Sequence, residues 1–235
     1  ISVSEVTYRY PESGADALRG VSLCLYEGEF VALLGENGCG KTTLAKHLNG
    51  LLRPTSGSVT VAGMDTRFAS APDLARQVGY LFQNPDHQIF ADTVHAEVAF
   101  GPRNLGLAED EVRDRVQQAL ALVGLEGYAQ RDPFVLTKGE RQRVALASIL
   151  AQRPRVIVFD EPTTGLDGPQ QERMMELLAE LNRAGQTIVI ITHCTWAAAG
   201  YARRALVMDD GRLVADLPVR ELFGNDDLLA RARRP

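Results

Sequence analysis

The chain has 235 residues, 45% of them apolar, which is enough for one full hydrophobic core without a second domain. Its formal net charge is −5, so the overall charge does not favour a nucleic acid or an anionic lipid surface as a partner. The three cysteines are odd in number and far apart, which argues against a disulfide framework or a zinc pair and favours a reducing compartment.

The N-terminal part predicts two strands. Apolar and polar residues alternate over residues 3–8 and 18–25, as they do in half-buried strands, and we expect the two to pair in antiparallel fashion. Tyr8, at the end of the first strand, and Tyr10 lie upstream of a glycine-rich loop. An aromatic ring there is able to stack on a purine base, although strand tyrosines are more often packing residues.

An apolar strand at 30–34 leads into a loop of the form G-x-x-x-x-G-K-[ST], followed by a helix over about 41–49. In this pattern backbone N–H groups surround a phosphate, and the positive end of the helix dipole points at the same group. Lys41 is expected to reach the β and γ phosphates and Thr42 to ligate Mg²⁺. The predicted ATP-binding residues of the loop are Gly35, Glu36, Asn37, Gly38, Cys39, Gly40, Lys41, Thr42 and Thr43.

Two more strands are predicted at 56–61 and 77–82, and Gln83 lies just beyond the second. Ligand-binding residues of open α/β sheets occupy such strand ends, and an amide there can hold a metal-bound water. Taken alone, Gln83 is more often a polar loop residue. From 84 to about 153 the pattern becomes helical, with segments at 94–100 and 109–123, so we expect an inserted helical lobe.

A helix is predicted to begin at 136–140, Leu-Thr-Lys-Gly-Glu. Thr137 and Glu140 have the spacing of a capping box. A capped N-terminus with a glycine in its first turn is also an anion site. If no nucleotide lies near it, the capping role alone explains the pattern.

A continuous apolar strand at 155–159 ends in two adjacent carboxylates, Asp160 and Glu161. Such a pair is costly at the exit of a buried strand unless a positive group faces it. Mg²⁺ at Asp160 is the expected partner. Glu161, on the opposite side of the strand, is expected to polarise a water for attack on the γ phosphate. The pair matches the Walker B pattern of P-loop ATPases.

The C-terminal part predicts a loop at 165–167, a helix from Pro169 and a buried strand at 186–191. His193 follows that strand, where it is placed to hydrogen-bond a γ phosphate or its attacking water. The other histidines, His47, His87 and His95, are expected at the surface. A hairpin around 205–215 and a short helical end close the chain.

Taken together and in order, these motifs resemble the nucleotide-binding subunit of ATP-binding cassette (ABC) transporters over essentially the whole chain. The resemblance implies an α/β fold with a P-loop NTPase (RecA-like) core, an antiparallel β subdomain and an inserted α-helical subdomain. It implies a single ABC ATPase domain over 1–235, with the core and β subdomain at about 1–87 and 154–218. The helical subdomain would occupy about 88–153 and a short helical tail about 219–235.

The same resemblance implies a head-to-tail dimer that closes on two ATP molecules with Mg²⁺. One protomer would supply most of each site. Its catalytic residues would be Glu161, His193 and Gln83, and its Mg²⁺ ligands would be Thr42, Gln83 and Asp160. Tyr10 of the same protomer would stack on the base. The signature motif would meet the ATP of the partner protomer; it comprises Leu136, Thr137, Lys138, Gly139 and Glu140. Asp167 would belong to the D-loop.

A narrower resemblance comes from residues 83–90 (QNPDHQIF) and 98–106 (VAFGPRNLG), which look like the ATPases of energy-coupling factor (ECF) transporters and related cobalt and nickel importers. This implies a second ATPase subunit, a transmembrane coupling subunit, a small substrate-binding membrane subunit and no nucleic acid as partner. No signal peptide and no apolar run of about 18 residues is evident, so we expect a peripheral location on the cytoplasmic face of the membrane. Whether a vitamin or a metal ion is imported, and whether the dimer is homo- or heteromeric, is left open.

Two departures from the family pattern bear on function. The usual L-S-G-G-Q signature is here L-T-K-G-E, so Lys138 replaces a glycine; we hypothesise slower or asymmetric hydrolysis at the site that this signature completes. Cys194 follows His193 where many relatives carry Asp. Two alternatives remain: a soluble ABC ATPase not coupled to transport, and an ATP-binding partner within a catalytically asymmetric heterodimer.

Overall fold

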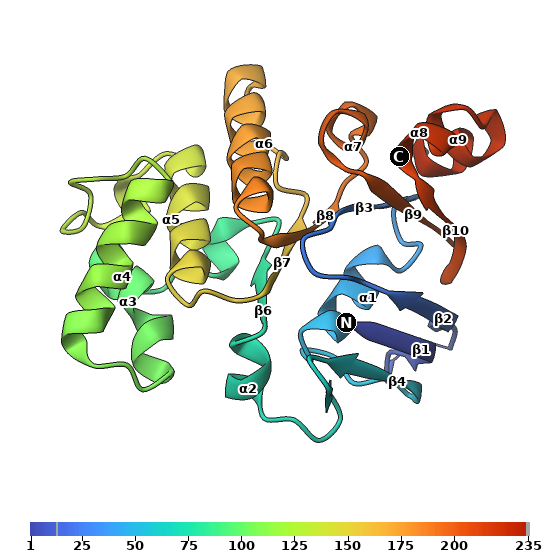
Figure 1. Ribbon diagram of the computed structural model, residues 1–235, viewed down its shortest axis with the longest axis horizontal. Coiled ribbons are helices and arrows are strands. Elements are labelled where there is room, and N and C mark those ends of the chain that lie inside the picture. Colours follow the sequence, from blue (N-terminus) through green and yellow to red (C-terminus); the bar gives the residue numbers. More distant parts are fainter. Residues whose placement is uncertain (13, 234–235) are drawn as a thin grey trace.

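A six-stranded sheet forms the centre of the protein (Figure 1). The computed structural model describes residues 1–12 and 14–233. The strands lie in the order β10-β9-β3-β8-β7-β6, and all but β10 run parallel to their neighbours. Their bounds are β3 Phe30–Gly35, β6 Val78–Leu81, β7 Val156–Asp160, β8 Thr187–Ile191, β9 Arg204–Asp209 and β10 Arg212–Pro218. β3, β7 and β8 are buried at every residue, as their unbroken apolar runs predict.

A smaller antiparallel sheet packs against one face of the large one. It has the order β2-β1-β4-β5, with β1 Ser2–Arg9, β2 Asp16–Cys24, β4 Ser56–Val61 and β5 Met64–Asp65. Its inner residues share a core with α1 (Lys41–Leu48) and with one side of β3, β7 and β8. The antiparallel pairing of the two N-terminal strands is confirmed.

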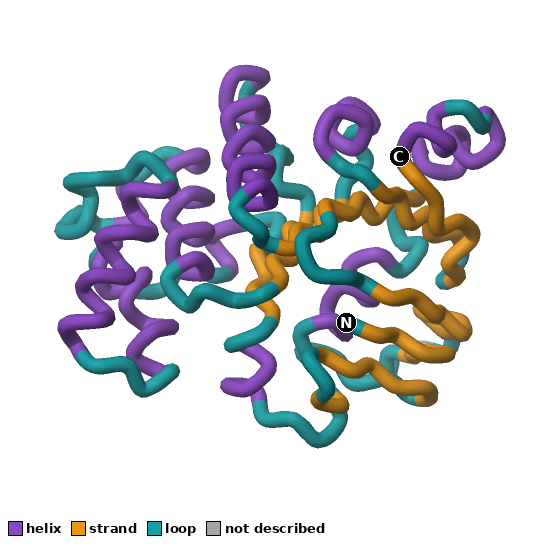
Figure 2. Tube along the Cα trace, viewed as in Figure 1, coloured by secondary structure: helices purple, strands orange, loops and turns teal. Residues whose placement is uncertain are grey.

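The other face of the large sheet is covered by helices, which appear purple in Figure 2. α6 (Gly168–Arg183), α7 (Thr195–Tyr201), α8 (Val219–Phe223) and α9 (Asp226–Arg233) follow the C-terminal strands. α3 (Val94–Asn104), α4 (Glu109–Leu122) and α5 (Lys138–Leu150) pack together as a lobe, green and yellow at the left of Figure 1. α2 (Ala71–Ala75) and two single 3₁₀ turns, Pro85–His87 and Pro133–Val135, connect these parts.

The α/β class, the P-loop NTPase core and the presence of a helical lobe are confirmed. The short elements β5, α2 and α7 are too brief to show a period and were not anticipated. The proposed subdomain limits stay a prediction, and residues 234 and 235 of the predicted tail lie outside the described residues. Among the described residues, no helix is long and apolar enough to cross a membrane.

Candidate active site

The glycine-rich loop between β3 and α1 has a backbone that favours glycine. Gly35, Gly38 and Gly40 have φ values of 144°, 81° and 104°. At Gly40 an added Cβ would also lie 2.6 Å from the carbonyl oxygen of Ala17. Gly40 immediately precedes α1, so the loop ends at the positive pole of that helix, where backbone N–H groups have no partner within the helix.

Lys41 begins α1, and its side chain folds back over the loop. Its Nζ donates hydrogen bonds to the carbonyl oxygens of Gly35 and Glu36, at 2.9 and 2.7 Å. The residue is only 7% exposed. A buried ammonium beside a helix N-terminus makes this end of the loop strongly positive, which suits an anion such as a phosphate.

Asp160 ends β7 opposite the loop, and two hydroxyl groups hold its carboxylate. Thr42 Oγ1 lies 3.1 Å from Oδ2 and 3.4 Å from Oδ1, and the Tyr80 hydroxyl donates to Oδ2 at 2.8 Å. Burial, together with the Asp160 charge, raises the pKa of Tyr80 far above its ordinary value, so the phenol stays a neutral donor. The cluster joins the first helix, β6 and β7 at one point.

Glu161 follows directly, and its backbone departs from strand geometry. Its φ is 51°, in the left-handed region that a non-glycine residue rarely adopts. Strand alternation predicts that Asp160 and Glu161 point to opposite sides; instead both line the same cavity. Glu161 Oε1 lies 2.9 Å from His193 Nδ1, and Thr164 Oγ1 lies 3.4 Å from Oε2.

These groups surround a cavity of about 470 Å³. It is lined by Tyr10, Ala17, Asn37, Gly38, Gly40, Lys41, Thr42, Thr43, Gln83, Asp160, Glu161, Thr164, Ile191 and His193. The structure therefore brings together residues from six segments of the sequence, and most of these residues are predicted from the motifs. The sequence did not predict the lining residues Ala17, Thr164 and Ile191, or Tyr80, which holds Asp160, because none of these residue types carries a distinctive signal at its position.

Tyr10 borders the cavity with its ring partly exposed. Its hydroxyl is 3.0 Å from Thr43 Oγ1, and its ring meets Tyr8 edge to face with centroids 4.9 Å apart. Three loop residues predicted for ATP binding, Gly35, Glu36 and Cys39, do not line the cavity. Cys39 is buried beneath the loop, and this burial raises the pKa of its thiol.

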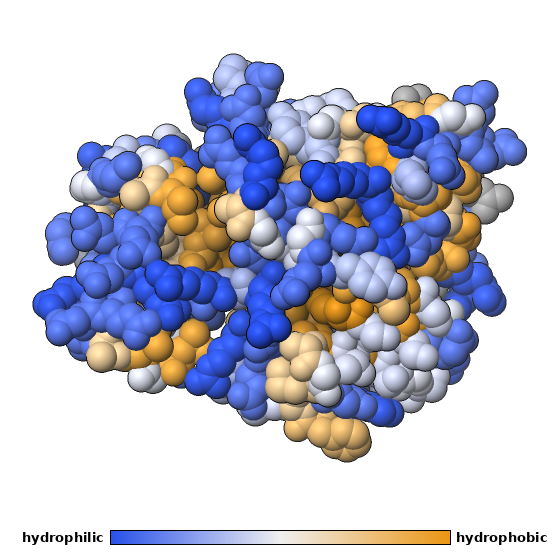
Figure 3. All heavy atoms as spheres, viewed as in Figure 1, coloured by the Kyte–Doolittle hydropathy of each residue, from blue (hydrophilic) through white to orange (hydrophobic). Residues whose placement is uncertain are grey.

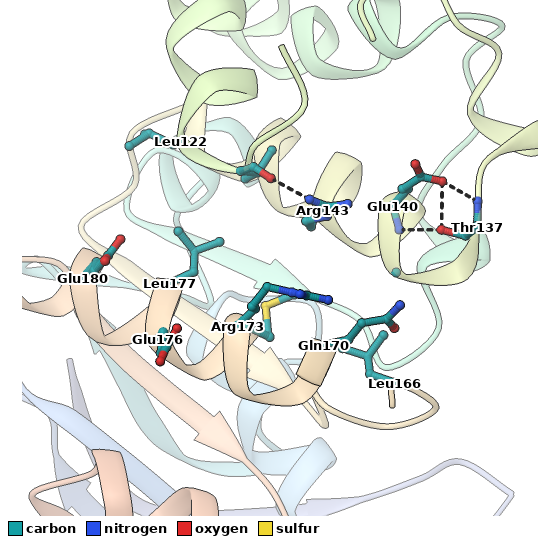
Figure 4. A pocket seen from close by; sticks show the side chains of 13 residues that line it. Leu122, Thr137, Glu140, Arg143, Leu166, Gln170, Arg173, Glu176, Leu177 and Glu180 are labelled. Carbon is teal, nitrogen blue, oxygen red and sulfur yellow. Dashed lines mark hydrogen bonds between the residues drawn. The ribbon is translucent and has the colours of Figure 1, made fainter. Parts of the chain in front are cut away.

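The signature residues lie elsewhere, beside a second cavity of about 510 Å³ between α5 and α6 (Figure 4). In the space-filling view the same region shows an apolar hollow (Figure 3). Thr137, Gly139 and Glu140 line this cavity, and Thr137 and Glu140 form the predicted capping box in full. Within one chain the capping role accounts for the Thr137–Glu140 pair, and the signature does not reach the cavity above the phosphate loop.

The remaining predicted residues of this region are placed as follows. Leu136 is buried in the core, and Asp167 caps α6 by accepting a hydrogen bond from the Gln170 N–H at 2.9 Å. The Lys138 side chain lies over Gly165, in the loop after β7: a Cβ added at Gly165 would be 2.2 Å from the Lys138 Nζ. The signature and the D-loop of one chain are thus in direct contact.

The expectation that His47 lies at the surface was wrong. The side chain is fully buried in α1, with Nδ1 2.7 Å from the Thr43 carbonyl oxygen and its ring edge to face with Tyr8. Burial lowers its pKa. The small sheet covers α1, so side chains on the covered face of this helix, including His47, are packed in the core. His87 is exposed and His95 half-buried.

The family model described as ABC transporter matches residues 18–164, which is more than half of the chain. The chain belongs to the ABC transporter family. The matched span includes the phosphate loop, Gln83, the signature and the Asp160–Glu161 pair. This ABC cassette is therefore an ATP-binding ATPase domain built on a P-loop NTPase core.

Among relatives, the energy-coupling factor transporter ATP-binding protein EcfA of Methanocaldococcus jannaschii is 44% identical over 234 residues, covering 99% of this chain and 84% of that protein. A putative ABC transporter ATP-binding protein of Caldanaerobacter subterraneus subsp. tengcongensis is 55% identical over 229 residues, or 97% of this chain. The ABC cassette spans only 40% of the length of that bacterial relative.

Solved structures agree with this assignment. CbiO1 of Clostridium perfringens, described as part of the ABC transporter complex CbiONQ, superposes with a TM-score of 0.86 at 35% identity, covering 97% of this chain and 92% of that one. A dimeric ATP-binding cassette in a post-hydrolysis state, bound to ADP and Pi, gives a TM-score of 0.82 at 31% identity, covering 93% and 98%. The ABC cassette is thus similar in sequence to a protein named as an ECF transporter ATPase and similar in structure to a subunit of an ABC transporter complex.

Proposed function

We propose that this chain binds ATP with Mg²⁺ above its phosphate loop and hydrolyses it to power import by an ECF-type membrane transporter. One observation carries the proposal: the Asp160–Thr42 pair and the Glu161–His193 pair face one cavity beside the loop. A metal-binding carboxylate and a base held by a histidine are what phosphoryl transfer to water requires at adjacent positions.

The loop residues 35–43 would bind the triphosphate. Lys41 would exchange its bonds to two loop carbonyls for the β and γ phosphate oxygens, since both are acceptors at the same end of α1. Glycine is required at 40, because a side chain there would meet Ala17. Tyr10, with its hydroxyl anchored on Thr43, would stack on the adenine base.

The residues present fit Mg²⁺. Among the described residues no three His, Cys, Asp or Glu side chains gather to hold a metal ion by themselves. Mg²⁺ needs few protein ligands, because it keeps waters and binds substrate phosphates. The donors offered by Thr42, Asp160 and Gln83 are all hard oxygen atoms beside the cavity. Bound there, Mg²⁺ would neutralise charge on the β and γ phosphates.

Glu161 would act as the general base. Its Oε1 is engaged by His193, so Oε2 is the atom that would accept a proton from the water attacking the γ phosphorus, while the bond to the bridging β–γ oxygen breaks. His193 donating from Nδ1 keeps that carboxylate in place. In its protonated form the same ring would also present Nε2–H to the γ phosphate.

A second copy, or a related subunit, would complete the site. The signature residues of this chain lie beside a different cavity from the phosphate loop, so they would reach only the nucleotide of a partner in a head-to-tail dimer. Lys138 favours one variant of this proposal, a catalytically asymmetric dimer, because its side chain fills the space over Gly165 that a signature glycine would leave open. Turnover that is unchanged in Lys138→Gly would count against that variant.

A groove on the helical lobe would receive the membrane partner. It has a volume of about 390 Å³, and it includes two half-exposed rings, Phe90 and Phe100, in edge-to-face contact with centroids 4.7 Å apart. Glu97 fixes the loop that carries Phe90 by accepting hydrogen bonds from the N–H groups of Phe90 and Ala91. Docking there would hold the cassette at the cytoplasmic face of the membrane as a peripheral subunit.

The proposal is tested by purifying the tagged chain from membranes extracted in mild detergent. We expect a polytopic coupling subunit and a small hydrophobic substrate-binding subunit to co-purify, and the Phe90→Ser, Phe100→Ser double variant to lose both. Leu51→Ser, at another exposed apolar residue, serves as the matched control. Recovery with ribosomes, DNA or nothing would instead favour a soluble ABC ATPase.

A further inference from the structure

Tyr80 is a buried strand residue that the phosphate-loop motifs do not include. It lies on β6, three residues before Gln83, and is 6% exposed. β6 and β7 are parallel neighbours with Tyr80 opposite Val158, so Tyr80 projects to the same side of the sheet as Asp160, two residues after Val158. Its ring packs against Phe82, with centroids 4.8 Å apart, which fixes the direction of the hydroxyl.

The Tyr80 hydroxyl gives the Asp160 carboxylate an asymmetric environment. Oδ2 accepts hydrogen bonds from Tyr80 at 2.8 Å and Thr42 at 3.1 Å, whereas the only contact of Oδ1 with a described residue is the longer one to Thr42, at 3.4 Å. Thr42 is itself a candidate metal ligand, but Tyr80 is anchored in the sheet. Tyr80 is therefore the donor that holds Oδ2 whichever way the Thr42 hydroxyl turns, and Oδ1 remains the oxygen able to coordinate.

We propose that Tyr80 is a positioning residue that orients the Asp160 carboxylate for one-oxygen coordination of Mg²⁺ and so sets the Mg²⁺ dependence of nucleotide binding. This inference rests on the proposed function of the same site. Mg²⁺ demands near-ideal octahedral geometry, so a carboxylate free to rotate binds it less well. Hydrogen-bond partners of metal-ligating groups typically alter metal affinity by 10–100-fold when they are removed.

The test measures binding of the non-hydrolysable analogue AMP-PNP by calorimetry, once with excess Mg²⁺ and once in EDTA. The ratio of the two affinities reports the metal contribution alone. We expect Tyr80→Phe, which keeps the ring, to lower this ratio about tenfold while leaving the affinity in EDTA unchanged. Tyr80→Met, which fills similar space without a hydroxyl, should do the same if the Phe variant folds poorly.

Tyr201→Phe is the matched control, because it removes a phenolic hydroxyl from α7, away from Asp160. Its ratio should equal that of the wild type. A wild-type ratio above one that is unchanged in both Tyr80 variants overturns this inference and leaves the proposed function intact. A wild-type ratio of one overturns both this inference and the proposed binding of ATP with Mg²⁺, because Mg²⁺ would then contribute nothing to nucleotide affinity. Equal losses with and without Mg²⁺ would assign Tyr80 a merely structural role and also overturn the inference.

Discussion

The left-handed backbone at Glu161 allows a quantitative test of how this site is built. Glu161 has a φ of 51°, where a Cβ costs about 1–2 kcal/mol. Glycine avoids that cost but loses about 0.5–1 kcal/mol of backbone entropy relative to alanine. Glu161→Gly and Glu161→Ala both remove the contact with His193, so that term cancels between them. The difference leaves glycine more stable than alanine by roughly 1 kcal/mol.

The assay is thermal unfolding of the two variants side by side. For a chain of this size, about 1 kcal/mol corresponds to a melting temperature roughly 2–4 °C higher for Glu161→Gly than for Glu161→Ala. The same pair at Glu172, an exposed position within α6, should give the opposite order, because alanine is favoured in a helix. If Glu161→Ala also has the higher melting temperature at this position, the idea that a strained backbone directs the Glu161 carboxylate toward the cavity is refuted.

Two further predictions concern α1 and the loop before it. Gly40→Ala should destabilise the fold and weaken ATP binding more than Gly38→Ala does. Both glycines have positive φ, but only at Gly40 would a Cβ lie 2.6 Å from the Ala17 carbonyl oxygen. Equal losses of melting temperature and of ATP affinity in the two variants would contradict this prediction. Burial lowers the pKa of His47 below its ordinary value of 6.5, so the unfolded chain binds a proton that the folded chain does not. The stability contributed by neutral His47 is therefore present above pH 6.5 and lost as the pH falls. Denaturant unfolding at several pH values should show that the free energy of unfolding falls more steeply with decreasing pH for the wild type than for His47→Asn. An equal pH dependence in the two proteins would contradict this prediction.

Features that depend on local pattern could be predicted from the sequence. Unbroken apolar runs identify β3, β7 and β8, because strands covered on both faces need no polar residue. The glycines of the phosphate loop predict the positive φ values found there, and the spacing of Thr137 and Glu140 predicts the capping box of α5. Each of these requires only neighbouring residues to determine the structure.

Features that depend on tertiary contacts could not be predicted in the same way. His47 is polar, yet it is buried because the small sheet covers α1. Tyr80 is typical of a packed strand residue, and only the register between β6 and β7 brings its hydroxyl to Asp160. The reversal at Glu161 overrides strand alternation, as strained residues at functional sites do.

The central claim is that Glu161 is the base for ATP hydrolysis in the cavity above the loop. The direct measurement is phosphate release by the transporter assembled from wild-type chain or from Glu161→Gln, with Glu172→Gln as the control at an exposed glutamate. We predict that Glu161→Gln still binds ATP but loses turnover by about 100-fold or more, the range by which a positioned general base accelerates a reaction. Turnover by Glu161→Gln at the wild-type rate would contradict the account.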